Sequence, residues 1–383
     1  MGEQRNEVRS LDEVLAQAES LIQPFQERAR LAEVEGDWLL ENLEDIKKAN
    51  FLGLTVPVEY GGNGFTLYEF IRFQEVLAQG DGATALSIGW HLGNILGNAE
   101  TRKWKETTFQ SLCEKIVRQK ALMNAVASER ATGSPARGGM PTTKAVQQAG
   151  GDWVINGEKA FASMAIALDY SLITAELGQS GQIGQFLIDH NTPGVKIKES
   201  WDSISMKATK SDDLLLQNVR VDKEALVSIS DNKTNLPKGW MLHIPAVYLG
   251  IAISARNEAI SFAKEYSPNT LPGPISDVPE VQRKIGEMEL ELFKARQILY
   301  AIAQKWSHSQ ELRANMGSEL GAVKHIVTNS AIRVVDVAMR IVGARSLSEK
   351  NPLQRYFRDV RAGIHNPPAD ENVIQQLAKR ALQ

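Results

Sequence analysis

Apolar residues recur every three or four positions through the first 120 residues of the chain, which is the pattern of amphipathic helices. This period predicts one long helix over residues 11–29 and a second over 38–48. Thr66 and Glu69 then form a capping-box pattern ahead of a helix over 67–79. Further helices are predicted over residues 83–98 and 101–120, whereas residues 51–58 are predicted to be extended around Pro57. The first 120 residues therefore form an all-helical region.

Strand signals dominate between residue 121 and about residue 222. Trp153-Val154-Ile155 precedes Asn156-Gly157, the strongest short-range signal for a β-hairpin turn. Further strands are predicted over residues 170–176, 185–189, 195–199 and 214–221, with turn residues between them. Several short strands separated by turns predict a small barrel or sandwich.

The helical period returns after Lys238-Gly239 and continues almost to the end of the chain. Apolar stripes predict long helices within residues 247–262, 281–306 and 323–341, followed by a fourth helix over 372–382. Long helices with short connections pack most simply as an antiparallel four-helix bundle. Residues 268–279 contain four prolines and are predicted to form an exposed loop.

The predicted fold class is therefore α+β, with three domains in order along the chain. They are an N-terminal helical domain (1–120), a central small β-barrel domain (121–232) and a C-terminal four-helix bundle (233–383). A chain of 383 residues is long enough for two or three hydrophobic cores.

Composition narrows the possible functions. The formal net charge is −3 with both signs interspersed, so the chain lacks the basic surface that nucleic-acid binding requires. The lone cysteine, Cys113, excludes an intramolecular disulfide and any cysteine-based zinc site. No signal segment and no run of 18 apolar residues occurs, so we expect a cytoplasmic protein that does not enter a membrane.

Two runs of small and hydroxylated residues supply the candidate chemistry. The first spans residues 128–134 and includes Ser128 and Ser134; the second is Phe161-Ala162-Ser163. Hydroxyls and backbone N–H groups from short loops can bind a flat polar cofactor while one of its faces stays open. A turn-capping role for each serine is the alternative when the residues are considered singly.

Five segments in order along the chain resemble the acyl-CoA dehydrogenase family, and the resemblance covers nearly the whole chain. They are residues 57–62 (P-x-x-Y-G-G), 128–134 (T-E-P-x-x-G-S-D), 156–163 (N-G-x-K-x-W/F-I-T/S), 204–216 (L-G-x-R-x-S/T) and 358–361 (R-D-A/V-R). The resemblance implies a helical domain, a small barrel and a four-helix bundle, as the periodicity also predicts.

The resemblance also implies a cofactor and a reaction. FAD would bind with Ser163 near N5, Phe161 against the ring system, and Ser128 with Ser134 at the pyrimidine edge and a neighbouring phosphate or substrate. An acyl-CoA thioester would lose its α proton to a carboxylate and a β hydride to flavin N5. An electron-transfer flavoprotein or a flavin reductase is an expected partner, and the chain is expected to form a homodimer or a homotetramer.

Two departures from the family pattern leave alternatives open. The family's Y-E-G-T base loop is replaced by residues 364–371, where the nearest carboxylates are Asp370 and Glu371; acidic residues in a first helical turn are also favoured by the helix dipole. The family's R-x-x-F-G segment is replaced by residues 267–274, so FMN is possible instead of FAD.

A flavin-dependent monooxygenase of the same fold is the main alternative function. Such an enzyme would use reduced flavin and oxygen, with Ser163, His91 and His365 near N5 and C4a. Each histidine has a structural alternative, as a satisfied helix histidine or as a loop hydrogen bond. A third alternative is a relative that binds acyl groups without catalysis.

Overall fold

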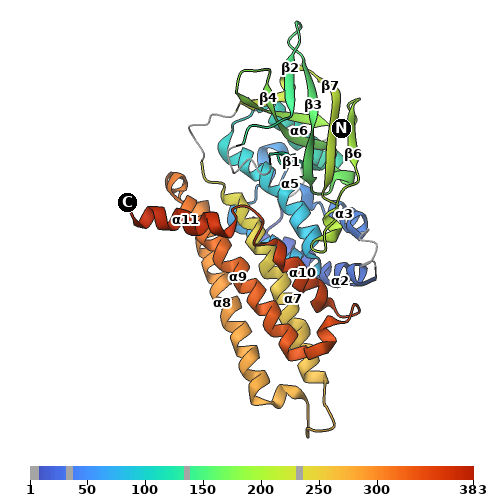
Figure 1. Cartoon of the computed structure of the whole chain (residues 1–383), viewed down its shortest axis with the longest axis vertical. Helices are drawn as coiled ribbons and strands as arrows, with labels where there is room; N and C mark the ends of the chain where they lie inside the picture. Colours follow the sequence, from blue (N-terminus) through green and yellow to red (C-terminus); the bar gives the residue numbers. More distant parts are fainter. Residues whose placement is uncertain (1–7, 32–37, 133–138, 230–235) are drawn as a thin grey trace.

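We describe a computed structural model of the chain over residues 8–31, 38–132, 139–229 and 236–383. Figure 1 shows a long helical body with a β-sheet region at one end. The N-terminal helices are α1 (Leu11–Ser20), α2 (Ile22–Leu31), α3 (Trp38–Lys48), α4 (Leu67–Gly80), α5 (Gly82–Thr101) and α6 (Glu106–Gln119). The predicted helical character of this region is confirmed, including the capping box in which Thr66 and Glu69 bond reciprocally at the start of α4.

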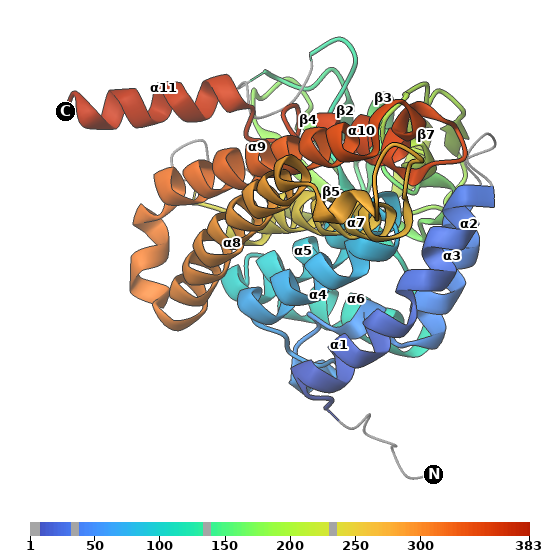
Figure 2. The ribbon, with the colours of Figure 1, turned by 90° about the horizontal axis from the view of Figure 1, so that it is seen from below.

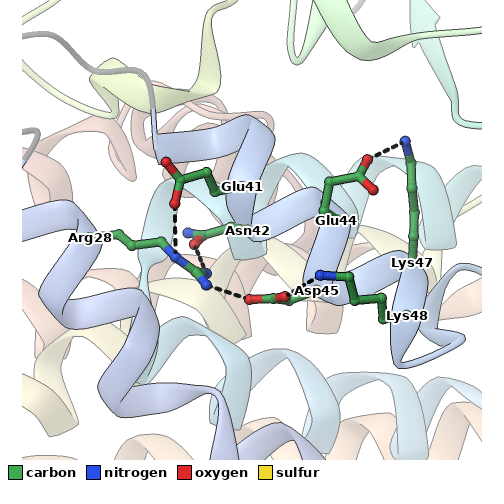
Figure 3. A network of polar contacts seen from close by, with 7 residues as sticks. All are labelled: Arg28, Glu41, Asn42, Glu44, Asp45, Lys47 and Lys48. Carbon is green, nitrogen blue, oxygen red and sulfur yellow. Dashed lines mark hydrogen bonds and ion pairs between the residues drawn. The ribbon is translucent and has the colours of Figure 1, made fainter.

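The predicted single helix over residues 11–29 is wrong, because the chain breaks at Leu21 into α1 and α2. A polar network then fastens α2 to α3 (Figure 3). The Arg28 guanidinium donates to the Asn42 side-chain oxygen at 2.9 Å and to the Asp45 carboxylate at 2.6 Å. The side-chain nitrogen of Asn42 donates to the Thr84 hydroxyl of α5 at 2.8 Å. One apolar period thus covers two helices, and Pro24, which has no N–H to donate to the carbonyl of Ser20, favours the break ahead of it.

The predicted extended segment over residues 51–58 is also wrong. Two 3-10 helices, Phe51–Gly53 and Val58–Tyr60, occupy this segment and its continuation. The turn after them is tight, because a Cβ at Gly62 would lie 2.1 Å from the carbonyl oxygen of Val56. The P-x-x-Y-G-G segment is therefore a compact turn that requires glycine.

The central region forms one eight-stranded sheet. Its strands are β1 (Met123–Val126), β2 (Lys144–Gln147), β3 (Trp153–Ala162), β4 (Tyr170–Leu177), β5 (Ile183–Asp189), β6 (Val195–Lys198), β7 (Asp212–Val221) and β8 (Leu226–Ile229). The order is β6-β7-β3-β2-β4-β5-β8, and β1 pairs with β4 in parallel. Within the described residues β6 and β8 do not pair, so the sheet is open and the predicted closed barrel is corrected.

The predicted hairpin turn at Asn156-Gly157 is wrong, because β3 runs straight through these residues. The register of β3 against β7 shifts between Ile155 and Gly157, which marks a bulge. The hairpin that joins β2 to β3 lies earlier, where Gln148 and Asp152 close a turn with Gly151 at φ +93°. Asn156-Gly157 and the turn at Gly151 both contain residues typical of a hairpin turn. The strand continues through Asn156-Gly157 because β7 pairs with β3 on both sides of these residues.

The C-terminal helices are α7 (His243–Glu265), α8 (Pro279–His308), α9 (Gly317–Val342), α10 (Pro352–Ala362) and α11 (Asp370–Ala381). Helices α7, α8 and α9 share one hydrophobic core with the N-terminal helices, whereas the sheet has a separate core. Figure 2 shows α11 extending away from this body. The predicted fourth helix therefore forms, but Val373 is its only fully buried residue, next to Gly321 of α9.

Candidate functional site

A chain of three buried hydroxyl groups ends at Ser163, directly after β3. Ser211 donates to the Ser163 hydroxyl at 3.1 Å, and Thr209 lies 2.8 Å from Ser211 between hydroxyl oxygens. Ser163 is only 8% exposed. Because Ser163 accepts from Ser211, its own hydroxyl hydrogen is available to donate, and no described residue accepts it. The sequence reasoning predicted Ser163 but missed Ser211 and Thr209, which lie in the 204–216 motif.

The backbone around Ser163 is held in an unusual conformation. Phe161 and Met164 both have positive φ angles, +61° and +54°, although neither is glycine. Met164 N–H donates to the Thr209 carbonyl at 2.7 Å, and the Asn124 side chain donates to the Ser163 carbonyl at 3.3 Å. Left-handed residues that are not glycine persist only where their surroundings enforce them, and they gather at functional sites.

Asn124 of β1 was not among the predicted site residues. It is 2% exposed, and its Oδ1 atom has no hydrogen-bond partner among the described residues. A buried carbonyl without a partner costs free energy, so such a group commonly meets a ligand or a water molecule. No sequence signal marks it, because a single asparagine inside a short strand belongs to none of the five family-like segments.

An exposed aromatic ring lies two residues before Ser163. The Phe161 side chain is 57% exposed and meets Trp201 edge-on, with ring centroids 6.2 Å apart. The Arg130 guanidinium lies 5.9 Å from the Phe161 centroid and forms a two-pronged ion pair with Asp213 at 2.8 and 3.0 Å. The exposed part of the Phe161 ring is therefore available to pack against a flat ligand.

The two predicted flavin segments are joined through a buried ion pair. Lys159 Nζ lies 2.7 Å from Glu129, and both side chains are almost fully buried. Thr142 and Thr143 supply further hydrogen bonds to Glu129. Burial opposes the charge of Glu129, but the hydrogen bonds from Lys159 and the two threonines outweigh it and lower its pKa to about 2.

Ser128 lies beside this ion pair, and its carbonyl accepts from Ala160 N–H of β3 at 2.9 Å. Its half-buried hydroxyl forms no hydrogen bond with the described residues. Ser134, the other predicted residue of this segment, lies outside the described residues. The structure therefore brings Ser128, Phe161 and Ser163 onto adjoining stretches around one end of β3.

The R-D-V-R segment of α10 fastens the helical body to the loop that carries the hydroxyl chain. The buried Asp359 carboxylate accepts from Met206 N–H at 2.6 Å, and Arg358 donates to the Ile204 carbonyl at 2.7 Å. Burial raises the pKa of Asp359 to about 7, although the Met206 N–H and Arg355 favour its charged form. Met206 is also the residue whose carbonyl accepts from Thr209 at 2.9 Å.

His91 is a structural histidine. Its Nε2 donates to the Leu52 carbonyl at 3.1 Å, while its Nδ1 accepts from Met123 N–H at 3.1 Å. Complete burial lowers its pKa to about 4, so the ring is neutral. Both ring nitrogens are engaged with backbone groups, and His91 joins α5 to the residue that precedes Asn124.

The three predicted catalytic residues lie beyond α10. His365 is exposed, and Glu371 is exposed in the first turn of α11. Asp370 accepts from the buried Lys324 at 3.1 Å and from Asn329 at 2.9 Å. Burial opposes ionisation of Asp370, but these bonds and the Lys324 charge lower its pKa, which makes it a weaker base.

The donors and acceptors at this site fit a flavin ring. An isoalloxazine accepts hydrogen bonds at N5 and along the N1–C2 edge, and it donates from N3. The Ser163 and Ser128 hydroxyls can supply donors, and Asn124 Oδ1 is a buried acceptor without a partner among the described residues. The uncovered face of Phe161 adds an apolar contact. Fold and site together thus define an oxidoreductase of the flavoprotein class.

Three family models match the chain in order. They describe the N-terminal, middle and C-terminal domains of acyl-CoA dehydrogenases and match residues 5–114, 124–219 and 242–366. YdbM of Bacillus subtilis (strain 168), which carries the name of an acyl-CoA dehydrogenase, is 49% identical over 360 residues that cover 94% of each chain. The chain belongs to the acyl-CoA dehydrogenase family, whose cofactor is FAD and whose members act on CH–CH bonds.

Two solved structures share the fold across nearly the whole chain. Butyryl-CoA dehydrogenase from Megasphaera elsdenii has a TM-score of 0.87 at 20% identity and covers all of both chains. The dibenzothiophene monooxygenase TdsC from Paenibacillus sp. A11-2, in complex with FMN and indole, has a TM-score of 0.86 at 22% identity and covers 96% of each chain. Among the described residues, no helix has the length and apolarity needed to cross a membrane.

Proposed function

We propose that this protein removes two hydrogens from adjacent carbons of an acyl-CoA thioester, with FAD held by Ser128, Phe161 and Ser163. The observation that carries the proposal is the hydroxyl chain that ends at Ser163, whose hydrogen no described residue accepts, beside the unpartnered Oδ1 of Asn124. Family membership supplies the reaction class. By analogy with the family pattern, Ser134 would complete the pyrimidine edge.

Bound FAD would accept the hydride that leaves the β carbon. The Ser163 hydroxyl oxygen accepts a hydrogen bond from Ser211, so its own hydrogen can be donated to the cofactor. Asn124 and the Met164–Thr209 hydrogen bond fix the position of Ser163. These residues hold and orient the ring, since none of them is a base.

We propose Glu371 as the acceptor of the α proton. Among the three predicted residues, Asp370 is already bound by Lys324, Asn329 and His325. Glu371 forms no ion pair or hydrogen bond within the described part of the chain, so its carboxylate is available. Its place in a first helical turn also has a structural explanation in the helix dipole, which makes the substitution below a necessary test.

The partner and assembly proposals follow from the same reaction. Reduced flavin must pass on two electrons before another turnover, and an electron-transfer flavoprotein is the proposed acceptor. We propose a homodimer or a homotetramer of two dimers. Support comes from α11, which extends from the body with Ile374 and Leu382 exposed (Figure 2).

The test is anaerobic mixing of the purified protein with saturated acyl-CoA thioesters of several chain lengths. We expect loss of the oxidised-flavin absorbance with at least one thioester. Ser163→Ala should weaken FAD binding and slow the loss of absorbance about a hundredfold, as for other removed transition-state donors. Glu371→Gln should retain FAD but stop the absorbance change; a normal rate in this variant would eliminate Glu371 as the base.

A monooxygenase is the second candidate, because Pro367-Pro368 and Asn366 occupy the loop where the family pattern has a glutamate. Tyr248 of α7 donates to Asn366 and holds this loop against the bundle. If no acyl-CoA bleaches the flavin, while reductase-supplied reduced flavin supports oxygen insertion into an aromatic or amine substrate, the dehydrogenase proposal is wrong and His365 becomes the residue to substitute.

A further inference from the structure

A cavity lies apart from the proposed flavin site, at the junction of several N-terminal elements. It has a volume of about 110 Å³ and shares no lining residue with the site described above. The residue before the N-cap of α1, the turn after α3, the Gly61-Gly62 turn and the end of α6 meet around it. Its lining residues are Arg9, Asn50, Leu52, Gly53, Gly61, Gly62, Asn63, Ile116, Val117 and Lys120.

The charged residues of this lining are both cations, Arg9 and Lys120, and no lining residue is acidic. Neither cation forms an ion pair within the described part of the chain. Burial lowers the pKa of Arg9, against the opposing charge of Glu13. Burial, followed by repulsion from Arg9, lowers the pKa of Lys120. Two positive charges are thus held near each other and partly out of water, and the anion that opposes them, Glu13, lies outside the lining.

Capping of helix ends accounts for part of this arrangement. Arg9 donates to Gln17 at 2.8 Å, to the Ala49 carbonyl at 2.9 Å and to the Asn50 carbonyl at 3.2 Å. Lys120 donates to the Asn50 side chain and, at 3.1 Å, to the Val117 carbonyl. Cations beside the final carbonyls of a helix are favourable in any protein.

These capping hydrogen bonds do not use every N–H donor of Arg9 and Lys120. A guanidinium carries about five N–H donors and an ammonium about three, so Arg9 retains its Nε–H and one Nη2–H, and Lys120 retains one N–H. The Asn63 side chain donates to the Arg9 carbonyl at 2.9 Å and thereby fixes the backbone that presents the guanidinium. The cavity therefore combines spare donors, two cations that form no ion pair within the described part of the chain, and a lining without carboxylates.

We propose that this cavity binds one small oxyanion, such as orthophosphate or a short carboxylate, between the Arg9 guanidinium and the Lys120 ammonium. The anion accepts the spare donors and neutralises the two charges. Its volume is well below the roughly 300 Å³ at which pockets for drug-sized ligands begin, so a whole nucleotide does not fit. Bound anion links α1, α3 and α6, and it stabilises the N-terminal region without touching the flavin site.

The test measures the unfolding midpoint of the full-length FAD-bound protein against the concentration of orthophosphate, and separately of acetate. Potassium chloride at matched ionic strength is the baseline. Lys120→Asn removes one cation, and asparagine tolerates the left-handed backbone at this position, where φ is +59°. Arg102→Asn is the matched control, since Arg102 is another left-handed cation at a helix end but is ion-paired with Glu59 and Glu106.

We expect a saturable rise in the midpoint with phosphate, acetate or both; the more effective anion identifies the preferred geometry. Lys120→Asn should weaken the apparent affinity about tenfold, the effect of one lost charge-assisted hydrogen bond. Arg102→Asn should keep the wild-type affinity even if its own midpoint falls. Arg9→Gln provides a second variant should Lys120→Asn fail to fold. A rise that chloride reproduces, or equal affinities in wild type and Lys120→Asn, would overturn the proposal.

Discussion

Glu129 is the residue on which the relative position of the two proposed flavin segments depends, because it binds Lys159 of β3 and both threonines ahead of β2. We expect Glu129→Gln to lower the free energy of unfolding by about 3–5 kcal/mol, since a buried Lys159 charge then lacks its partner. Urea denaturation at neutral pH measures the change. Flavin affinity should fall in parallel, because Ser128 is the neighbouring residue.

Glu158→Gln is the control for this prediction. Glu158 is the adjacent residue to Lys159 and pairs with Lys198 at 2.9 Å, but both partners are substantially exposed. An exposed pair contributes about 0–1 kcal/mol, so this variant should unfold nearly as wild type does. The pKa of Glu129 is lowered in the folded protein. Its contribution to the free energy of unfolding is therefore present above pH about 4.3, the pKa of an unfolded glutamate, and is lost as the pH falls through about 2. Equal losses in both variants would refute the assigned role.

Motif comparison names Ser128, Phe161 and Ser163 as candidates for flavin binding, because these residues lie inside contiguous patterns, and their role stays a prediction. It could not predict that Glu129 pairs with Lys159, 30 positions away, or that Ser211 donates to Ser163. Such pairs depend on strand register and on side-chain direction, which no local period encodes. Asn124 was missed for the same reason. What distinguishes it is a buried Oδ1 without a hydrogen-bond partner among the described residues, which can be recognised only in the packed structure.

Gly157 determines how β3 passes through its bulge. A Cβ at this position would lie 2.4 Å from the Thr143 hydroxyl and 2.7 Å from the Thr143 Cα, which belongs to backbone that cannot move aside. We expect Gly157→Ala to lower the free energy of unfolding by about 1–3 kcal/mol, as overpacking does. The displaced Thr143 would also weaken its bond to Glu129. Thermal and urea unfolding both measure this.

Gly150→Ala is the matched control, because Gly150 lies in the nearby β2–β3 hairpin and a Cβ there meets nothing within 4 Å. This variant should unfold within a few tenths of wild type, or slightly later, since alanine restricts the unfolded chain. If Gly150→Ala is the more destabilised of the two, the bulge does not depend on the absence of a side chain at Gly157.

Among the elements, the long helices were predicted well because one buried face persists over many turns, as in α8 and α9. Predictions failed in short segments whose residues are typical of one conformation but adopt another one in the fold. Asn156-Gly157 satisfies a hairpin rule, yet β7 pairs along both sides of it and keeps the strand continuous. Residues 51–58 satisfy an extended pattern around proline, yet hydrogen bonds between nearby backbone groups form 3-10 turns in this segment and its continuation.

In the whole molecule, the three regions predicted from the sequence pattern (helical, strand-rich and helical) form two hydrophobic cores. Helix α4 packs against α7 and α8, so the N-terminal and C-terminal helices share one apolar cluster and the sheet forms the other. Periodicity locates each helix, but it does not say which helices bury their faces against one another. Specific contacts such as Asp359 to Met206 and His91 to Met123 hold the helices against the loop ahead of β7 and against β1.

The contact between Asp359 and Met206, which joins α10 to the loop ahead of β7, makes the stability of the protein sensitive to pH. Burial raises the pKa of Asp359 to about 7, with Asp81 adding to the effect and Arg355 opposing it. The folded protein therefore holds a proton that the unfolded chain releases near pH about 4. This contribution to stability is complete below that pH and is lost as the pH rises toward 7.

Asp359→Asn isolates this effect, because an amide oxygen can still accept from Met206 N–H while the group no longer titrates. We expect the free energy of unfolding of wild type to fall relative to that of Asp359→Asn as the pH rises from about 4 to about 7. Urea unfolding at several pH values measures both curves. Parallel curves would mean that Asp359 does not retain its proton in the folded state, and α10 would then be joined to the loop ahead of β7 by a charged contact with Arg355 as the compensating cation.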